Sequence, residues 1–535
     1  MGLSNRLVVL GLDSLPPGLT RDLAKSGVMP FINELMEKGS FGTLHSVTPS
    51  NTGSGWNSAW TGLPPTQHGY FGFYHYDPQD DIIRVSTSDR LKVPTLWQML
   101  NGYGLKTLVI NSPMQYPATK LDGVMVSGFM APSIQAPCAY PPSFHEKLKR
   151  EIPDYIFDVP WDKHNDDDRT FEANIAAVIK VFNQRVAITK LAAGWTSWDV
   201  LIIVFKSVDN MLHYTWDYIA NEHSNHKRRQ LTLNAFRILD DACRKIALMA
   251  GYPDANILVC SDHGHGPIKG QLFINRLLAQ WGLLTPQSRL NKALTKHIIS
   301  IRKRIRIGKF RKKLSTHISA RLKVKWNKSR AIVIQGSCIY LNVKGRQPQG
   351  IISPQQYERV RRDIANRLRL LKDETTGATL IEKLDCPVEA TPKPIPLHEP
   401  AIPDIIFQPV SGVVIKKVTT REGPIYQPGH YDNNHQGSHT PEGIILGAGP
   451  NFARAASVEG NLYDVAPTAL AACGLPIPHG LVGKPIAALL NHKVKIKYDT
   501  KKAAPATSES PSLQAYSSEE EEIIRQRLTN LGYLD

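Results

Sequence analysis

The sequence predicts an α/β fold in which a mostly parallel sheet is flanked by helices and interrupted by an inserted cap domain. Short apolar runs alternate with helical patterns over the first 120 residues, which is typical of βαβ units. Between residues 271 and 432 this pattern gives way to basic and Pro-rich stretches, and it returns at residue 443. With 535 residues, 42% of them hydrophobic, the chain is long enough for one large domain with an insertion or for two ordinary domains.

The first part of the predicted core covers residues 1–270. Its expected elements, in chain order, are a strand at Leu7–Leu12, a helix at Phe31–Lys38, a patterned segment at Val93–Asn101, a strand at Thr107–Asn111, a strand at Val200–Phe205, a helix near 226–250 and a strand at Asn256–Cys260. Because ligands in open α/β sheets sit beyond the carboxyl ends of the strands, we expect Asp13, Asp209 and Asp262 to converge there.

The rest of the chain is expected to hold the insertion, the second part of the core and a C-terminal helix. The insertion, residues 271–432, contains a β-like run at Ala331–Val343, a helix near 355–371 and Pro-rich stretches near 386–403. The core resumes over residues 433–492. Residues 493–535 are expected to form a linker, over 493–511, and a short amphipathic helix that Ser518 and Glu521 cap and that carries Ile524, Leu528 and Leu531.

Nothing in the sequence predicts a membrane span or secretion. The densest apolar run, Leu201–Phe205, is far shorter than the roughly 18 residues that a span needs. The N-terminus reaches its first strand too early to hold a charged region, an apolar region and a cleavage site. Six cysteines stand without a CxxC pair or a repeated spacing, so neither a disulfide framework nor a thiolate zinc site is expected. We therefore expect a soluble, cytoplasmic protein.

The formal net charge of +17 comes almost entirely from one segment. Residues 289–330 hold sixteen Lys or Arg and no Asp or Glu, which leaves a balance of +1 for the rest of the chain. Within residues 294–322, apolar side chains recur at near-helical spacing, which predicts a basic amphipathic helix. Such a helix could bind an anionic membrane surface or nucleic acid, or frame the entrance for an anionic substrate. It could equally be a solvated face packed on the cap.

Four separate segments carry side chains that can bind metals. They are Asp13 after the first strand, Asp209 with His213, Asp262 with His263, and His439 late in the chain. Residues four apart on a helix share a face, so Asp209 and His213 could reach one ion, whereas the adjacent Asp262 and His263 could diverge toward different metals. Carboxylate and imidazole together suit zinc, manganese or iron better than magnesium or calcium. An isolated Asp-x-x-x-His is more often a surface pair, so the argument depends on the joint occurrence at strand ends.

The segment Thr48–Gly62 places hydroxyl groups between a Pro turn and an expected helix. A helix N-terminus there would point free N–H groups at a bound phosphoryl group. The alternative is an ordinary capped helix start.

Taken together, these residues resemble the alkaline phosphatase superfamily, and within it the type I phosphodiesterase and nucleotide pyrophosphatase branch. The resemblance covers roughly residues 5–280 and 325–490. The family's nucleophile pattern, T-x-x-x-W-x-x-x-x-T-G-x-x-P-x-x-H-G, runs here from Thr52 to Gly69. Gly437–Gly443 resembles its late histidine motif, and the stretches Ile339–Gly350 and Ala401–Ile405 also resemble the family. The resemblance implies an alkaline-phosphatase-like core.

The resemblance also implies a metal-dependent phosphoester hydrolase, most directly a phosphodiesterase that forms a phosphothreonine intermediate on Thr52. Of two divalent ions, one would be bound by Asp209, His213 and His439, and the other by Asp13, Thr52, Asp262 and His263. Zn²⁺ is the first expectation and Mn²⁺ the second. The alternatives are a phosphomonoesterase or phosphonate hydrolase of the same superfamily and, in another class, a basic scaffold that binds membrane or nucleic acid without turnover.

Substrate contacts are expected from Asn51, Gly53, Phe73 and Lys206. Phe73 stands where nucleotide pyrophosphatases usually carry an Asn that holds a phosphoryl oxygen, so the resemblance does not extend to nucleotide preference. Lys206 could contact a phosphoryl oxygen, but a solvated side chain is the favoured interpretation. His265 could orient a ligating histidine or face solvent. His68, which follows a proline turn, is expected to be structural.

Overall fold

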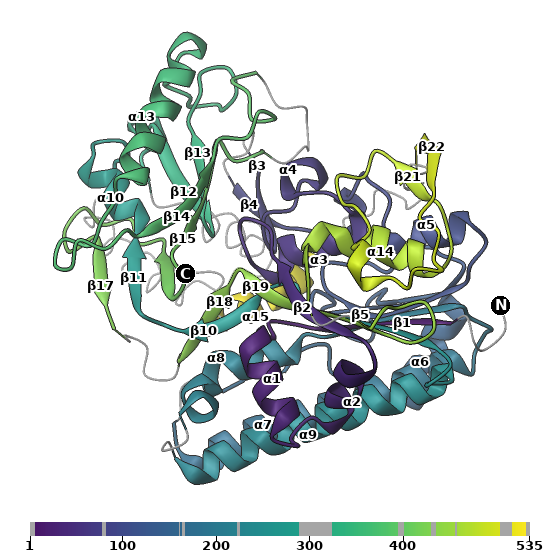
Figure 1. Cartoon of the computed structure of the whole chain (residues 1–535). Helices are drawn as coiled ribbons and strands as arrows, with labels where there is room; N and C mark the ends of the chain where they lie inside the picture. Colours follow the sequence, from purple (N-terminus) through teal and green to yellow (C-terminus); the bar gives the residue numbers. More distant parts are fainter. Residues whose placement is uncertain are drawn as a thin grey trace, which may run out of the picture. The chain divides into compact units, whose positions relative to one another are not determined.

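The computed structural model describes residues 6–77, 82–159, 161–162, 166–221, 225–287, 324–393, 401–429, 435–454, 457–502 and 516–530. The chain divides into two compact units, whose elements are labelled in Figure 1. The core unit comprises Met1–Phe73, Ser86–Lys269 and Gly429–Leu534, and the insertion unit comprises Tyr74–Val85 and Gly270–Pro428. The amphipathic helix predicted at residues 294–322 lies outside the described residues, as does most of the basic segment.

The core unit is built on a nine-stranded sheet, which confirms the predicted α/β fold with a mostly parallel sheet. The strand order is β20 (Val458–Asn461), β2 (Ser40–His45), β19 (Glu442–Ala448), β9 (Asn256–Cys260), β1 (Leu7–Leu12), β8 (Val200–Phe205), β5 (Thr107–Ser112), β6 (Gly123–Ser127) and β7 (Ala139–Tyr140). β19 and β7 run antiparallel to their neighbours, and the other pairs are parallel. Leu12 pairs with Phe205, and Gly11 pairs with both Val204 and Cys260, so β1, β8 and β9 end together.

Helices cover both faces of this sheet (Figure 1). One face carries α1 (Pro17–Lys25), α2 (Pro30–Lys38), α7 (Asp168–Ala193) and α9 (His226–Ala250), and the other carries α3 (Thr52–Thr61), α5 (Leu96–Gly102) and α14 (Val465–Ala472). The core unit also contains α4 (Pro65–His68), α6 (Pro142–Glu151) and α8 (Ser207–Ala220). Because both faces are covered, β1 and β8 are buried along their whole length, which explains their continuous apolar sequences.

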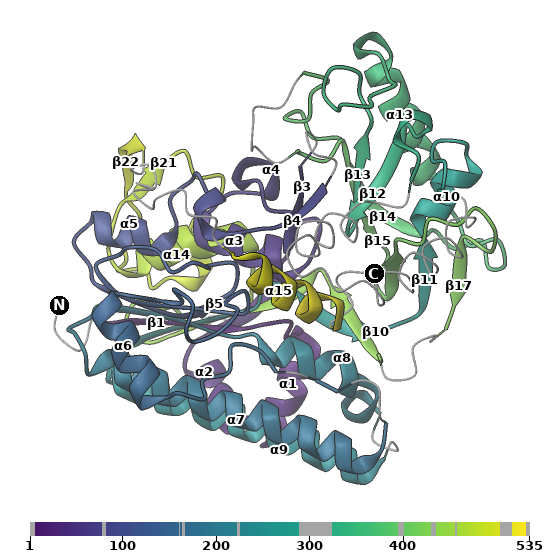
Figure 2. The same cartoon turned by 180° about the vertical axis from the view of Figure 1, so that it is seen from behind.

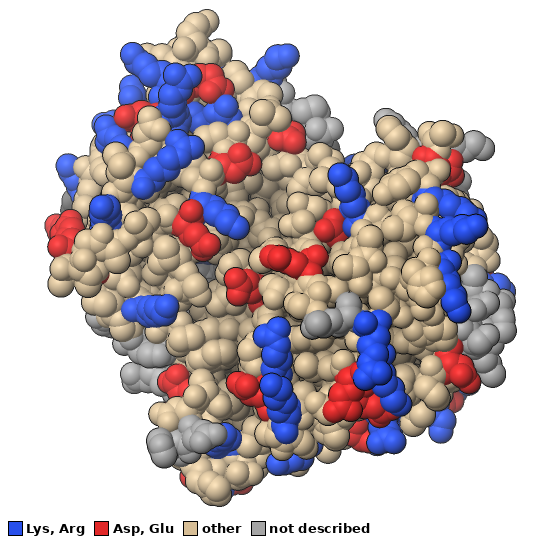
Figure 3. All heavy atoms as spheres, viewed as in Figure 1, with Lys and Arg blue, Asp and Glu red and all other residues tan. Residues whose placement is uncertain are grey.

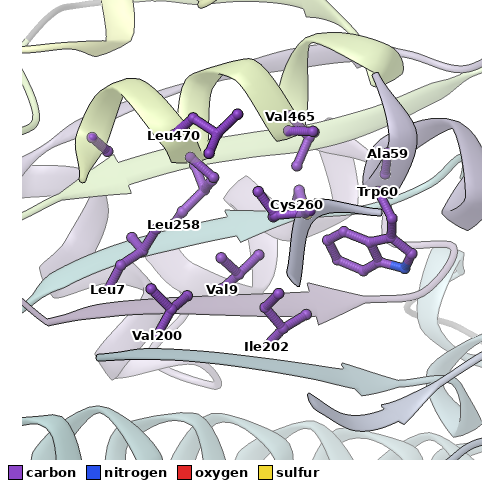
Figure 4. Packing of buried hydrophobic residues seen from close by; sticks show 14 of the residues in the cluster. Leu7, Val9, Ala59, Trp60, Val200, Ile202, Leu258, Cys260, Val465 and Leu470 are labelled. Carbon is purple, nitrogen blue, oxygen red and sulfur yellow. The ribbon is translucent and has the colours of Figure 1, made fainter. Parts of the chain in front are cut away.

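Alternate residues of the central strands form the core beneath α3 and α14 (Figure 4). Leu7 and Val9 of β1 pack there with Ile202 of β8, Trp60 of α3 and Leu470 of α14. Successive strand side chains point to opposite faces, so the residues between them pack on the other side of the sheet. Each of these five side chains is at most 1% exposed. Burying a side chain such as Val9 stabilises the fold by about 1.5–3 kcal/mol. The carboxyl ends of the central strands are therefore held in place by a well-packed core.

The insertion unit contains a four-stranded antiparallel sheet in the order β12 (Ala331–Gln335), β13 (Cys338–Leu341), β15 (Ile405–Pro409) and β14 (Ile381–Asp385). The β-like run predicted at Ala331–Val343 is confirmed, and it contains two strands, β12 and β13. Gly336 takes a positive φ of 45° and turns the chain, which makes the run two antiparallel strands. The other elements of this unit are α10 (Ile274–Gln280), α13 (Tyr357–Arg369), a sheet of β16 (Val413–Lys416), β11 (Gly270–Phe273) and β17 (Tyr426–Pro428), and a hairpin of β3 (Tyr74–Asp77) and β4 (Ile82–Val85).

The last described part of the chain is α15 (Ser518–Asn530), which packs on the core unit. It lies in front in the view of Figure 2. Its capping box joins Ser517 and Glu520, one residue earlier than predicted, because the N-cap is the residue that precedes the first helical residue. Ile524 and Leu528 are fully buried, whereas Leu531 lies outside the described residues. The predicted linker is also interrupted, since β22 (Tyr498–Lys502) pairs with β21 (Ile477–His479).

The described surface carries charges of both signs. In Figure 3, many Lys and Arg side chains lie where α13 is found. On the rest of that face, Lys and Arg are mixed with Asp and Glu. Among the described residues, no helix is both long enough and apolar enough to cross a membrane. The predicted binding of membrane or nucleic acid concerns residues 289–330, of which the structure describes only 324–330, so it stays a prediction.

Candidate metal centre

The ends of three parallel strands bring carboxylates and imidazoles to one edge of the sheet in the core unit. Asp13 follows β1 directly, and Asp262 comes two residues after β9. Asp209 and His213 lie on α8, which begins two residues after β8. A ribbon of β10 (Gly264–Pro267) and β18 (Gly437–Thr440), in which His265 pairs with His439, completes this edge. The register of the sheet thus brings residues that are far apart in the sequence within reach of one another.

Asp209, His213 and His439 form one compact group. Oδ1 of Asp209 lies 3.1 Å from Nε2 of His439 and 3.3 Å from Nε2 of His213. The two Nε2 atoms are 3.1 Å apart. The other ring nitrogen of His213, Nδ1, lies 2.8 Å from the carbonyl oxygen of Gly437. This contact orients the imidazole so that Nε2 faces the group, as is usual for metal-ligating histidines.

Asp13, Asp262 and His263 form a second group beside the first. Nε2 of His263 lies 3.2 Å from Oδ2 of Asp262 and 3.9 Å from Oδ1 of Asp13. The expectation that Asp262 and His263 diverge toward different metals is therefore wrong, because both side chains point into the same group. The rings of His263 and His439 are 4.0 Å apart between centroids, so the two groups adjoin.

Each carboxylate presents one oxygen to the centre and gives the other to a donor of the chain. The indole N–H of Trp56 donates to Oδ2 of Asp13 at 2.7 Å. The backbone N–H of Ser14, a residue held at a positive φ of 69°, donates to Oδ1 of Asp262 at 3.3 Å. Oδ2 of Asp209 faces Nζ of Lys206 at 3.5 Å. This arrangement fixes how all three carboxylates are turned.

Burial and mutual repulsion set the protonation of these groups. Burial raises the pKa of Asp13 well above its ordinary value, and the carboxylates of Asp262 and Asp209 raise it further. Burial and Asp209 raise the pKa of Asp262 in the same way. Burial lowers the pKa of His263 and of His439, which favours the neutral form of both imidazoles. A neutral imidazole is the form that binds metals, and crowded buried carboxylates ionise together only beside cations.

The side chains of both groups fit divalent cations. The buried Oδ2 of Asp262 and the buried Nε2 of His263 make no hydrogen bond, although they are near neighbours. Buried polar atoms are seldom left without a hydrogen-bond partner, and a cation between two such acceptors would satisfy both. Each group of three offers ligand atoms that all lie within 4.8 Å of one another. Carboxylate oxygens with imidazole nitrogens are a donor set typical of zinc and manganese.

Thr52 is the first residue of α3, and its fully buried hydroxyl lies beside the second group. Oγ1 of Thr52 is 3.4 Å from Oδ1 of Asp13. The N-cap is Asn51, whose Oδ1 accepts from the N–H of Ser54 at 3.1 Å. A Cβ at Gly55 would lie 2.9 Å from Cβ of Asp262, so only glycine lets the helix approach this closely. The first N–H groups of a helix lack partners within it, which leaves the start of α3 able to bind an anionic group.

Three of the four predicted substrate contacts lie around this helix start. The amide of Asn51 is used within the fold, because its Nδ2 also donates to the carbonyl oxygen of Phe71 at 3.1 Å. Gly53 permits close packing, since a Cβ there would lie 2.6 Å from the carbonyl carbon of Gly72. Phe73 is buried, with its ring centroid 5.0 Å from that of Phe129. Roles for these residues in substrate binding stay predictions.

The favoured interpretation of Lys206 as a solvated side chain is wrong. Its side chain is 1% exposed, because it follows a strand that is covered by helices on both faces. The sequence carried one signal for this burial, which is the Asp and Asn that follow three and four residues later, on the same face of α8.

The sequence left the role of His265 undecided and did not single out His435. His265 is buried, with Nδ1 2.6 Å from Oγ of Ser14 and 3.9 Å from Oδ1 of Asp209, so it does not face solvent. His435 was missed, although its Nε2 lies 2.8 Å from Nδ1 of His213. Its position four residues before His439 was the available signal.

Comparisons with known proteins identify a family and proteins of similar fold. The profile of the family described as type I phosphodiesterase / nucleotide pyrophosphatase matches residues 7–441. Phosphonoacetate hydrolase from Sinorhizobium meliloti 1021, solved with phosphonoacetate, is similar in fold at 16% identity and a TM-score of 0.50, over 87% of this chain and 95% of that one. Murine and human ectonucleotide pyrophosphatase / phosphodiesterase 5 align at 13% identity and a TM-score of 0.46, over 91% of this chain and 100% of theirs. No curated protein sequence matches the chain.

Proposed function

Since the chain belongs to the type I phosphodiesterase / nucleotide pyrophosphatase family, in the alkaline phosphatase superfamily, and is therefore a hydrolase of phosphoric ester bonds, we propose that it cleaves phosphodiesters with Thr52 as the nucleophile. The observation that carries the proposal is the position of the Thr52 hydroxyl. It lies at a helix N-terminus, 3.4 Å from the carboxylate of Asp13 in the second group of candidate ligands. A helix N-terminus favours a bound phosphoryl group through its free N–H groups and its partial positive charge.

The superfamily uses divalent metal ions, and the two groups of ligands would hold one ion each. Asp209, His213 and His439 would bind the first, and Asp13, Asp262 and His263 would bind the second, with Thr52 beside it. The mixed donor set favours Zn²⁺, with Mn²⁺ as the second choice. When bound, such ions lower the pKa of a nearby hydroxyl and stabilise negative charge on phosphoryl oxygens.

The chain's own residues then account for two displacement steps. Oγ1 of Thr52 attacks phosphorus, the bond to the leaving oxygen breaks, and the leaving alcohol carries away the proton that the Thr52 hydroxyl gives up. The N–H groups at the start of α3 hold the phosphoryl oxygens meanwhile. A water molecule next attacks the phosphothreonine, the bond from phosphorus to Oγ1 breaks, and the hydroxyl of Thr52 is restored. Asp13, whose Oδ2 is held by Trp56, keeps its Oδ1 beside Oγ1 throughout.

Hydrolysis of bis-p-nitrophenyl phosphate, measured beside p-nitrophenyl phosphate and a phosphonate, tests the proposal with Zn²⁺ or Mn²⁺ added. The variants are Thr52→Ala, Thr52→Ser and the control Thr61→Val. Thr61 is also a fully buried threonine of α3, but its hydroxyl donates to the backbone of its own helix at Asn57. We expect diester turnover to fall by several orders of magnitude in Thr52→Ala, to survive in part in Thr52→Ser, and to persist in Thr61→Val.

Each other outcome has a distinct meaning. If the monoester or the phosphonate is the main substrate and its turnover also depends on Thr52, the nucleophile stands and the chain is a phosphomonoesterase or a phosphonate hydrolase. Turnover that survives in Thr52→Ala would refute the assignment of the nucleophile. Equal losses in Thr52→Ala and Thr61→Val would show that α3 is being disrupted and that the loss says nothing special of Thr52.

A further inference from the structure

One of the three carboxylates of the centre differs from the others in what holds it. Asp13 and Asp262 are held by neutral donors, an indole N–H and a backbone N–H. Asp209 is instead held by a cation, because its Oδ2 lies 3.5 Å from Nζ of Lys206. Its Oδ1 faces Nε2 of His213 and of His439. The two oxygens of Asp209 therefore have separate tasks.

The ammonium group of Lys206 is enclosed by partners. Nζ donates to Oδ1 of Asn210 and lies 3.9 Å from Oδ1 of Asp158. It also lies 4.5 Å from the centroid of the Phe129 ring. Nδ2 of Asn210 in turn donates to Oδ1 of Asp158 at 2.7 Å, which ties this second carboxylate into the same network. One amide oxygen thus accepts a hydrogen bond from the ammonium group, two carboxylate oxygens lie within ion-pair distance of it, and an aromatic ring lies beside it.

This enclosure has an energetic reason. The side chains of Lys206, Asp158 and Asp209 are at most 2% exposed, and burying a charge is costly unless it is paired. Removing the ammonium would leave two buried carboxylates close together and would free Oδ2 of Asp209. That carboxylate could then rotate, and Oδ1 would no longer be held toward the two histidines. A substrate contact would instead require Lys206 to leave acceptors that are themselves buried.

We infer that Lys206 is a positioning residue, which holds the carboxylate of Asp209 so that Oδ1 faces His213 and His439, and that it does not contact the substrate. The inference rests on the proposed function, in which these three residues bind one of two cations. This role differs from both alternatives that the sequence left open for Lys206, a solvated side chain and a contact to a phosphoryl oxygen.

Metal binding without substrate separates these roles. The metal-free wild type and Lys206→Met would be titrated with Zn²⁺ or Mn²⁺ against a chelating dye, and bound metal would be counted by mass spectrometry. We expect one of the two sites to bind about 10–100-fold more weakly in Lys206→Met, as is typical when a residue that orients a ligand is lost. The second site should be unchanged, and KM for the diester should be unchanged at saturating metal.

The matched control is Asp240→Asn. Asp240 is a buried charged residue of the core unit whose carboxylate accepts from the backbone N–H groups of Phe31 and Ile32. This variant should lose stability and keep both metal affinities, whereas a merely structural Lys206 would behave in the same way as Asp240. If Lys206→Met does not fold, Lys206→Gln retains an N–H donor, on a shorter and neutral side chain, and should show a smaller weakening at the same site.

The results that would overturn the inference are distinct from a failure of the proposed function. Unchanged metal affinity with a raised KM would make Lys206 a substrate contact. Unchanged affinity and unchanged KM would leave it with a purely structural role. A wild type that binds no metal would refute the proposed function together with this inference, whereas an effect confined to Lys206→Met bears on this inference alone.

Discussion

Replacing Arg346 by Met should destabilise the insertion unit by about 3–5 kcal/mol, because it leaves a buried carboxylate without its cation. The two terminal nitrogens of Arg346 donate to Oδ1 and Oδ2 of Asp404 at 2.9 and 2.7 Å. They also donate to the carbonyl oxygens of Thr391 and Leu341 at 2.8 and 2.6 Å. Asp404 is fully buried and Arg346 is 5% exposed, so water cannot replace these contacts.

The size of the loss follows from what stays behind. The hydroxyl of Tyr357 and the backbone N–H of Leu341 still donate to Asp404, each at 2.6 Å, so the carboxylate keeps two hydrogen bonds. What it lacks is a counter-charge. Adding Asp404→Asn to Arg346→Met removes that charge and keeps an oxygen acceptor for one of the two donors, Tyr357 or Leu341. We therefore expect the double variant to lose less free energy of unfolding than the two single variants lose together, by about 1–3 kcal/mol.

Urea unfolding followed by tryptophan fluorescence measures both quantities, since two of the nine tryptophans, Trp281 and Trp326, lie in the insertion unit. A change of two-state midpoint in that unit, at constant slope, gives the difference in the free energy of unfolding. A loss under about 1 kcal/mol in Arg346→Met, the value of an exposed pair, would refute the reasoning. So would a double variant whose loss equals the sum of the two single losses.

Two further effects can be measured in the core unit. His68 accepts from the N–H of Tyr70 and lies 2.8 Å from Oγ of Ser58, and burial lowers its pKa to about 3. The unfolded chain, with a pKa near 6.5, therefore takes up the proton first, so the stability from His68 is intact above that pH and falls by about 1.4 kcal/mol per pH unit below it. When the pH falls from 7 to 5, the free energy of unfolding measured with urea should fall by about 2 kcal/mol less in His68→Gln than in the wild type. If the two proteins lose stability equally with pH, the prediction is wrong. Arg527→Met removes hydrogen bonds to the carbonyl oxygens of Phe129 and Ala131, about 1 kcal/mol each, so limited proteolysis should release α15 faster, and an unchanged rate would count against its role as an anchor.

The parts of the fold that could be predicted are those in which a local pattern has one physical outcome. The runs Leu7–Leu12 and Val200–Phe205 are apolar throughout, and such runs are stable as strands only when both faces are covered. Turns and caps were predicted less well, because they depend on single backbone angles. Gly336 divides one predicted β-run into two strands, and Ser517 takes the capping position that was given to Ser518.

The candidate site shows the same division. Chemically distinctive side chains that follow strands, such as Asp13 and Asp262, could be picked out from the sequence, and their resemblance to a family pattern suggested ligand groups. Their roles as ligands, and that of Thr52 as the nucleophile, stay proposals. The direction in which His263 points, the hydrogen bond from Trp56 to Asp13, and the contact between His435 and His213 were not predictable, since each joins residues whose distance depends on the register of the sheet.

By itself, then, the sequence determined the class of fold, the strands at its centre and the kind of chemistry that the polar residues at their ends can perform, because hydrophobic periodicity and side-chain chemistry are local properties. Only the tertiary structure decided which atoms face one another. Lys206 is the clearest case, since a lysine read in isolation favours solvent. It is buried here because helices cover both faces of β8, and because oxygens of Asp158, Asp209 and Asn210, from two separate parts of the chain, meet around its charge.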